Sequence, residues 1–96
     1  MDFFIGQIFP FPYTFIPQYF APCDGRLIPI RDNAALFSLL GTTYGGDGQN
    51  TFAIPDLRPR NPDGSLMADV KVGQLIHGTS YIPSYIALQG IYPSRP

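Results

Sequence analysis

The chain has 96 residues, one cysteine and a formal net charge of −1, so it is expected to form one small domain over residues 1–96 without an internal disulfide. Its lysines and arginines are scattered, with Arg58 and Arg60 the nearest pair, which excludes the concentrated positive charge of a nucleic-acid-binding surface. No apolar run approaches the roughly 18 residues of a membrane span. The opening residues lack the basic region of a secretory signal, so we expect a product made without a signal peptide.

Proline and glycine set the expected class of fold. Eleven Pro and ten Gly would suggest disorder in a polar chain, but 45% of the residues are hydrophobic. Glutamate is absent and Lys71 is the only lysine, whereas long helices draw on both residue types. The composition therefore predicts a small, loop-rich, mainly β fold with one short α-helix (α+β).

Aromatic residues are too numerous for one small core. Fourteen residues are Phe or Tyr, whereas only 14% are charged. A chain of this size buries only about 60–65% of its unfolded surface, so its stability as a monomer is marginal. A disulfide or a metal site could add stability, but the chain has one cysteine, Cys23, and one histidine, His77, which is a poor basis for either. We expect neither metal nor cofactor, and predict a homo-oligomer whose interface candidates are Phe3, Ile5, Phe9, Phe11, Tyr85 and Tyr92.

Alternating apolar residues predict a first strand over residues 3–11, with its odd-numbered positions on one face. Prolines 10 and 12 remove hydrogen-bond donors, so this strand ends there or lies at an edge. A second extended piece is expected over residues 17–22. Residues 23–26 predict a tight turn with Gly25 at positive φ, and a short strand over residues 27–30 follows.

Residues 32–41 carry the one clear helix signal. Asp32 or Asn33 can cap its start, and Gly41 stands where a left-handed C-terminal residue belongs. The helix has about two turns, so it must pack on the sheet. Its apolar side is formed by Leu36, Phe37, Leu39 and Leu40.

The second half of the chain is predicted to be loop-rich. A glycine-rich loop over residues 42–50 precedes a short extended piece over 51–55, and residues 61–64 predict a turn. Residues 70–76 alternate weakly, and residues 81–92 indicate a closing strand pair or one long bulged strand. We predict that at least one chain end pairs or packs with a neighbouring subunit. The alternative is that the two ends pair with each other inside one chain.

Residues that invite a chemical interpretation also have simpler ones. The glycine loop at residues 41–48 lacks the Gly-Lys-Ser/Thr ending of a phosphate loop and follows a helix, so it is interpreted as a structural turn with positive φ at Gly41 and at least one later glycine. Cys23 and His77 lack a visible orienting partner. No catalytic residue is expected, because carboxylates beside turn signals usually cap those turns, and this applies to Asp24, Asp47, Asp56 and Asp63.

Several stretches resemble the phage tail-collar domain family. They are AALFSLLGTTYGGDG at residues 34–48, TFAIPDLR at 51–58, FIGQI at 4–8 and CDG at 23–25. The end, IALQGIYPSR at residues 86–95, is similar to microcystin-dependent members of the family. The structural-motif residues carried by the resemblance are Cys23, Asp24, Gly25, Leu36, Phe37, Gly41, Tyr44, Gly45, Gly46, Asp47, Gly48, Pro55, Asp56, Leu57 and Arg58.

The chain departs from the family's pattern at three places. The family usually has Gly-Trp where this chain has Tyr19 and Phe20, and a glycine where this chain has Pro59. The segment between the two matching blocks, residues 60–80, is shorter than in most members, so the distal receptor-binding region of larger fibre proteins is not expected here.

The resemblance implies trimeric, intertwined packing and no enzymatic activity. It points to a structural subunit of a phage tail, a tail-like particle or an extracellular fibre, located in a virion or an extracellular assembly. Its partners would be copies of itself, as a homotrimer or polymer, and other tail or fibre proteins. Two alternatives stay open: a self-polymerising bacterial surface filament subunit, and a small carbohydrate-acting hydrolase that uses two of the aspartates.

Overall fold

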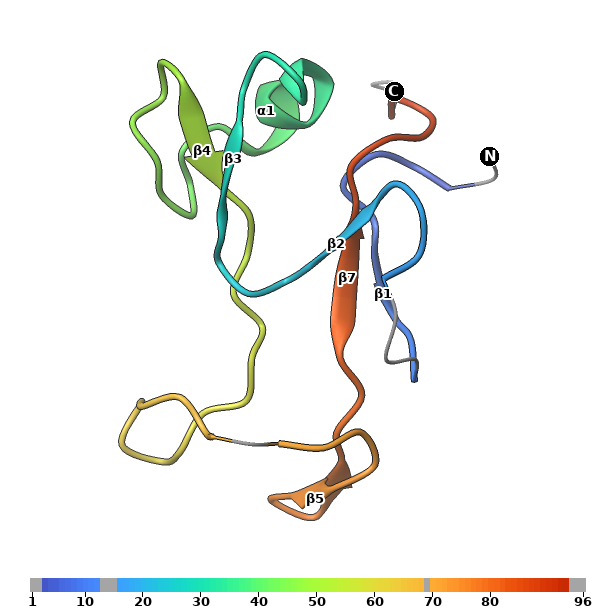
Figure 1. The fold of residues 1–96 in the computed structure, drawn as a ribbon, viewed down its shortest axis with the longest axis vertical. Helices are drawn as coiled ribbons and strands as arrows, with labels where there is room; N and C mark the ends of the chain where they lie inside the picture. The colour runs from blue at the N-terminus through green and yellow to red at the C-terminus, as the bar shows by residue number, and fades with distance from the viewer. Residues whose placement is uncertain (1–2, 13–15, 69, 94–96) are drawn as a thin grey trace.

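Short strands interrupted by proline and glycine dominate the structure, and one short helix accompanies them, which confirms the predicted class of fold (Figure 1). The computed structural model describes residues 3–12, 16–68 and 70–93. Its elements are β1 (Ile8–Pro10), β2 (Phe20–Pro22), β3 (Leu27–Pro29), α1 (Ala34–Leu40), β4 (Thr51–Ala53), β5 (Leu75–Ile76), β6 (Thr79–Ser80) and β7 (Ser84–Ala87).

The first and last strands lie side by side. β7 is the central strand of a three-stranded antiparallel sheet in the order β1-β7-β2, in which Phe9 and Pro22 both stand opposite Tyr85. A second antiparallel pair, β3 and β4, sets Ile28 opposite Phe52. The chain ends thus pair with each other inside one chain, which is the alternative arrangement considered for them. The last residues of the family-like C-terminal stretch, 94–96, lie outside the described residues.

The first strand is shorter than predicted because Gly6 interrupts it. Gly6 has a φ of +85°, outside the β region, and its N–H donates to the carbonyl of Ala87 (2.9 Å). The alternation predicted for residues 3–11 therefore breaks. Ile5 packs against the main core, whereas Phe3 and Phe9 join an aromatic layer on the other side.

Proline ends three of the outer strands in the two core sheets. Pro10 ends β1, Pro22 ends β2 and Pro29 ends β3. Proline has no N–H to donate to a further strand, so it is a common way to protect a sheet edge. These edges are poor templates for adding a strand from another chain.

The buried core draws side chains from both sheets and from α1. Leu36 of α1, Phe52 of β4, Ile54 and Ile86 of β7 are fully buried. Ala21, Cys23 and Ile28 complete the cluster. A core of this size agrees with the expectation that so short a chain buries little apolar surface by itself.

The helix is present but its capping differs from the prediction. α1 begins after Asn33, whose side chain makes no cap hydrogen bond; its amide instead donates to the carbonyl of Pro29 (3.0 Å). Gly41 has the predicted positive φ of 57°, although its ψ of −143° lies outside the left-handed helical region. Its N–H still donates to the carbonyl of Phe37 (2.7 Å), so the last turn is closed without an αL residue.

The segment at residues 23–26 has the positive φ predicted for Gly25, but it does not join two strands of one sheet. The φ of Gly25 is 77°, and β2 and β3 belong to different sheets, so this segment carries the chain from one sheet to the other. The N–H of Gly25 donates to the carbonyl of Pro55 (3.2 Å) rather than closing a hairpin. The partner lies across the fold, which no local signal reveals.

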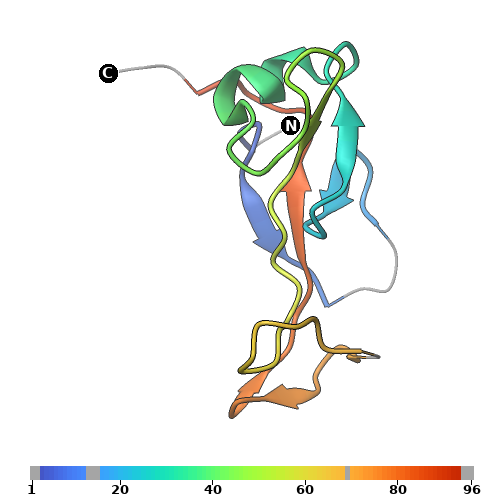
Figure 2. The same cartoon turned by 90° about the vertical axis from the view of Figure 1, so that its left-hand side faces the viewer.

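Residues 59–82, here called the arm, extend away from one end of the core (Figure 2). The predicted turn at 61–64 is present, with the Gly64 N–H donating to the carbonyl of Asn61 (2.9 Å). β5 and β6 form a two-residue-loop hairpin that was not predicted, with His77 and Gly78 both at positive φ. The sequence signal for this hairpin was the pair His77–Gly78, which stands between the apolar pair Leu75–Ile76 and the polar pair Thr79–Ser80. Beyond the arm, the closing stretch holds one short strand, β7, and a bridge from Phe4 to Ile91.

Candidate functional site

Two of the family-like motifs meet on one side of the core. Asp24 and Asp56 face each other in an isolated antiparallel bridge. The N–H of Leu57 donates to the carbonyl of Cys23 (2.8 Å), which holds the two segments in register. A Cβ at Gly25 would lie 3.1 Å from the Cβ of Asp56, so only glycine fits this approach without a shift. The residues 23–25 and 55–58 are thus one structural unit.

Each aspartate of this unit binds the arginine two residues further on, in the same geometry. Asp24 accepts from Arg26 at Nε (3.0 Å) and Nη2 (2.9 Å), and Asp56 accepts from Arg58 at Nε (2.9 Å) and Nη2 (2.7 Å). In both cases Oδ1 also accepts the backbone N–H of that arginine at 3.2 Å. Arg60 adds a second cation to Asp56 at 3.1 Å.

The electrostatics of this unit keep both carboxylates ionised. The hydrogen-bonded Arg26 side chain lowers the pKa of Asp24 below its ordinary value. The Arg58 side chain lowers the pKa of Asp56 well below the usual range, with Arg60 adding to the effect. A general acid needs a carboxyl whose pKa is raised, so neither carboxylate of this pair is suited to that role.

The glycine loop closes on itself around Asp47. The Oδ1 of Asp47 accepts the backbone N–H groups of Gln49 (2.9 Å), Asn50 (2.9 Å) and Thr51 (3.0 Å). These backbone donors, Thr51 first, lower the pKa of Asp47 to about 2. The carboxylate therefore serves the turn, as expected for an aspartate between glycines.

Close backbone approach explains the glycine at position 46. Gly45, Gly46 and Gly48 all have positive φ, which confirms the prediction for this loop. A Cβ on Gly46 would lie 2.4 Å from the Cα of Phe52 and 2.7 Å from the carbonyl oxygen of Thr51. The loop runs against β4, and the N–H of Ala53 donates to the carbonyl of Gly45 (3.0 Å). Tyr44 in the same loop is half exposed.

An aromatic layer covers the face of the three-stranded sheet that lies opposite the main core. Phe20 is at its centre, with ring centroids 5.0 Å from Phe3, 5.8 Å from Phe9 and 5.5 Å from Phe11. Tyr85 joins through Phe11 at 5.7 Å. Four of the interface candidates are thus gathered in one place, and Phe20, which was not among them, ties them together. Tyr85 is buried within the chain, and the four phenylalanines are partly exposed.

The remaining two interface candidates lie elsewhere. Ile5 packs against the main core. Tyr92 is 50% exposed, and its hydroxyl shares a hydrogen bond of 2.6 Å with the Ser38 hydroxyl of α1. The structure therefore separates the six candidates into an aromatic layer, a core residue and a side chain that holds the end of the chain on the helix.

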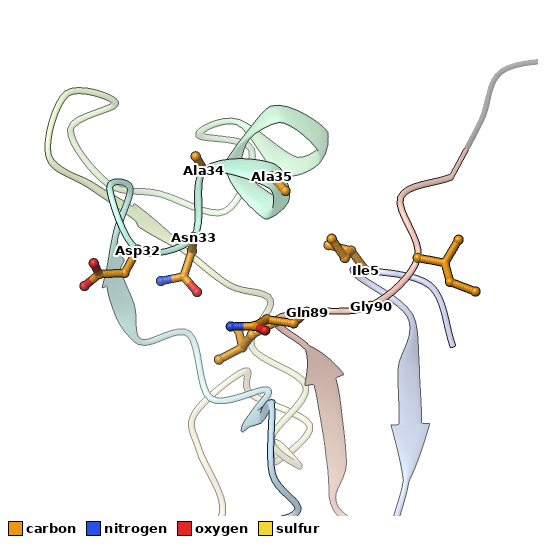
Figure 3. Close-up of a pocket in the computed structure, with 9 residues that line it drawn as sticks. Ile5, Asp32, Asn33, Ala34, Ala35, Gln89 and Gly90 are labelled. Carbon is orange, nitrogen blue, oxygen red and sulfur yellow. The ribbon is translucent and has the colours of Figure 1, made fainter. Parts of the chain in front are cut away.

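A cleft of about 530 Å³ opens between the start of α1 and the turn after β7 (Figure 3). Figure 3 shows Ile5 and Gln89 on the strand side, and Asn33, Ala34 and Ala35 on the helix side. Asp32 is its one ionisable lining residue. A single carboxylate among apolar and amide side chains supplies no acid–base pair.

Cys23 and His77 lie far from any reactive arrangement. Burial raises the pKa of the Cys23 thiol to about 11, with Asp24 adding to the effect, so the thiolate form is disfavoured. His77 lies in the turn between β5 and β6. Within the described residues, no three His, Cys, Asp or Glu side chains gather closely enough to hold a metal ion. No helix in the described part of the chain is long and apolar enough to cross a membrane.

Comparison with known protein families identifies a matching family. A family model described as Phage Tail Collar Domain matches residues 6–62, which include β1 to β4, α1, the glycine loop and the Asp24–Asp56 unit. No curated protein and no solved structure gives a significant match.

Proposed function

Because the chain belongs to the phage tail collar domain family, we propose that it is a structural subunit of a phage tail, a tail-like particle or a related extracellular fibre. It works by associating with copies of itself, as a trimer or polymer, and with other tail or fibre proteins. Its place is then a virion or an extracellular assembly. The family is a structural domain of phages. The motifs within the matched residues are a short helix, a glycine loop and the Asp24–Asp56 unit, and each of them shapes the backbone.

The observation that carries self-association is the amount of apolar surface left open. Among the described residues, fourteen large hydrophobic side chains are at least 39% exposed, whereas four large side chains are fully buried. Contact between copies would bury part of this exposed apolar surface, which supports self-association. Only 14% of the residues are charged, so little repulsion opposes contact between copies.

The carboxylates argue against the hydrolase alternative. Two-carboxylate hydrolysis needs one group with a raised pKa to donate a proton and another that stays ionised. Here the pKa values of Asp24, Asp47, Asp56 and Asp63 are all lowered, by arginine side chains, backbone N–H groups or Ser65. Each of these carboxylates holds a turn or a bridge.

The filament alternative differs in how subunits would join. Polymerisation by strand addition needs an open strand edge. β1, β2 and β3 each end in proline, which disfavours strand addition at these three strands, whereas β4, β5 and β6 carry no proline.

Two measurements on the purified full-length chain test the proposal. Sedimentation velocity over a range of concentrations should give a closed oligomer or larger particle, and negative-stain electron microscopy should show compact particles or short fibres. A stable monomer at every concentration contradicts self-association. Long uniform filaments formed by the chain alone would favour the filament alternative instead.

A further inference from the structure

The chain contains three Asp-Gly pairs, and the structure places them in different surroundings. They are Asp24–Gly25, Asp47–Gly48 and Asp63–Gly64. In such a pair the glycine nitrogen can attack the side-chain carboxyl carbon of the aspartate and close a five-membered succinimide ring, because no Cβ shields that nitrogen. The local chemistry is the same in all three pairs, so the fold decides which of them reacts.

Ring closure needs room around the glycine. A Cβ at Gly25 would lie 3.1 Å from the Cβ of Asp56, and a Cβ at Gly48 would lie 3.1 Å from Cγ2 of Thr42. The same position at Gly64 has no atom within 4 Å. Of the three glycines, Gly64 is therefore the one whose backbone can turn without displacing a neighbouring segment.

The ring also removes the glycine N–H as a hydrogen-bond donor. The Gly25 N–H donates to the carbonyl of Pro55 (3.2 Å), which joins two segments that are distant in sequence. The Gly48 N–H donates to the carbonyl of Thr51 (3.0 Å), which ties the glycine loop to β4. Reaction at either of these pairs would break a bond that holds the core together.

The third pair lies in the turn at residues 61–65, within the arm that stands away from the sheets and the helix (Figures 1 and 2). All residues of this turn are exposed. The Gly64 N–H donates to the carbonyl of Asn61 (2.9 Å), which belongs to the same turn. An exposed turn opens locally at little cost in free energy, whereas a core segment opens at a cost approaching that of global unfolding.

Two donors converge on one oxygen of the Asp63 carboxyl group. Its Oδ1 accepts the Ser65 N–H (2.9 Å) and the Ser65 hydroxyl (2.6 Å). Attack on Cγ places negative charge on a carboxyl oxygen, and donors already aimed at that oxygen stabilise the charge. Hydrogen bonds lower the pKa of Asp24, Asp47 and Asp63 alike, so ionisation opposes the reaction at each pair and the surroundings decide between them.

We infer that Asp63 is a modification site at which the folded chain converts spontaneously to isoaspartate. The Gly64 nitrogen loses its proton to solvent and bonds to Cγ of Asp63, and one carboxyl oxygen leaves as water with the carboxyl proton and one proton from solvent. A water molecule then opens the ring. Opening at the main-chain carbonyl breaks the original bond to the Gly64 nitrogen, and the peptide then runs through the side chain. The water released in the first step is taken up in the second.

The product changes the start of the arm, because it lengthens the backbone by a methylene group inside the turn. The Asn61 N–H donates to the Ser65 carbonyl (2.7 Å), and Nη1 of Arg60 donates to the Gly64 carbonyl (2.8 Å). Arg60 also pairs with Asp56 at 3.1 Å. Conversion therefore alters a turn that is connected to the core through one arginine. The inference is independent of the assembly proposed above.

Ageing of the full chain tests the assignment. The protein is incubated at neutral pH both folded and unfolded in urea, and isoaspartate is located by peptide mapping with electron-transfer fragmentation. The folded rate at each pair is divided by the rate of the same pair in urea. We expect this ratio to be at least about tenfold higher at Asp63 than at Asp24 or Asp47. Equal ratios, a higher ratio at Asp24 or Asp47, or no conversion of Asp63 in the folded protein would overturn the inference.

A matched pair of glycine variants tests the reacting nitrogen. Gly64→Ala shields that nitrogen, and Gly78→Ala is its control, because Gly78 lies in the same arm at a similar positive φ and its Cβ would also have no atom within 4 Å. We expect Gly64→Ala to slow the conversion of Asp63 several-fold, and Gly78→Ala to leave it unchanged. Equal rates in the two variants would show that the Gly64 nitrogen does not form the ring, which also overturns the inference.

Discussion

Asp24 and Asp56 stand opposite each other in an antiparallel bridge, and each binds the arginine two residues further along in the same two-pronged geometry. The arrangement joins the passage between the two sheets to the segment that leaves β4. Because each carboxylate has its own guanidinium partner, two negative charges can face each other without repulsion. The unit fixes how the two sheets are connected and where the arm begins.

Replacing Asp56 should weaken the fold more than replacing an aspartate in the arm. Asp56→Ala removes the partner of both Arg58 and Arg60 and the acceptor for the Arg58 N–H. We expect a loss on the order of 1 kcal/mol in the free energy of unfolding, a figure already discounted for solvent screening. Urea denaturation measures it, with Asp63→Ala as the control because Asp63 holds only a local turn. Equal midpoints for the two variants would contradict the structural role of Asp56.

Gly46 and Gly64 offer a test of close packing at nearly constant backbone geometry. Their φ values are similar, 96° and 93°. A Cβ added at Gly46 would collide with the backbone of Phe52, whereas a Cβ added at Gly64 would have no atom within 4 Å. We expect Gly46→Ala to cost about 1–3 kcal/mol more than Gly64→Ala, because the loop must move away from β4. Thermal unfolding of both variants measures the difference. Equal losses of stability in the two variants would mean that the positive φ alone, and not close packing, explains why residue 46 is glycine.

Tyr19 has a strained backbone conformation, which glycine should accommodate better than alanine. Its φ of 70° is unusual for a bulky residue and is held by the hydrogen bond from the Leu88 N–H to its carbonyl (2.8 Å). Glycine relieves about 1–2 kcal/mol of left-handed strain and costs about 0.5–1 kcal/mol in chain entropy. Tyr19→Gly should therefore have a higher Tm than Tyr19→Ala, which loses the same ring but keeps the strain. Equal Tm values for the two variants would contradict strain at this position.

The lowered pKa of Asp47 predicts that the folded protein loses stability in acid. Its folded-state pKa of about 2 lies below the ordinary value of 3.8, so its contribution to stability is present above pH 4 and is lost as the pH falls toward 2. Asp47→Asn keeps an acceptor oxygen but cannot titrate. We expect its stability to fall less steeply than that of wild type between pH 4 and pH 2, in denaturation curves measured at each pH. Parallel pH profiles would contradict this role.

Local patterns in the sequence predicted the parts of the fold that depend on local backbone preference. The helix over residues 34–40, the positive φ values of the glycine loop and the turn at 61–64 follow from spacing, glycine and turn chemistry. The turn role of Asp47 was predicted for the same reason. The hairpin at His77–Gly78 was missed although its signal was local, because the flanking strands are only two residues long.

The tertiary structure decided what is distant in sequence. Alternation over residues 3–11 could not show that β1 pairs with β7, nor that Ile5 packs against the core while Phe3 contacts Phe20 in the aromatic layer. The Asp24–Asp56 bridge and the aromatic layer around Phe20 likewise join segments that share no local signal. Local propensity constrains φ and ψ one residue at a time, whereas strand partners are chosen by which apolar faces can be buried together, and that choice depends on the whole chain.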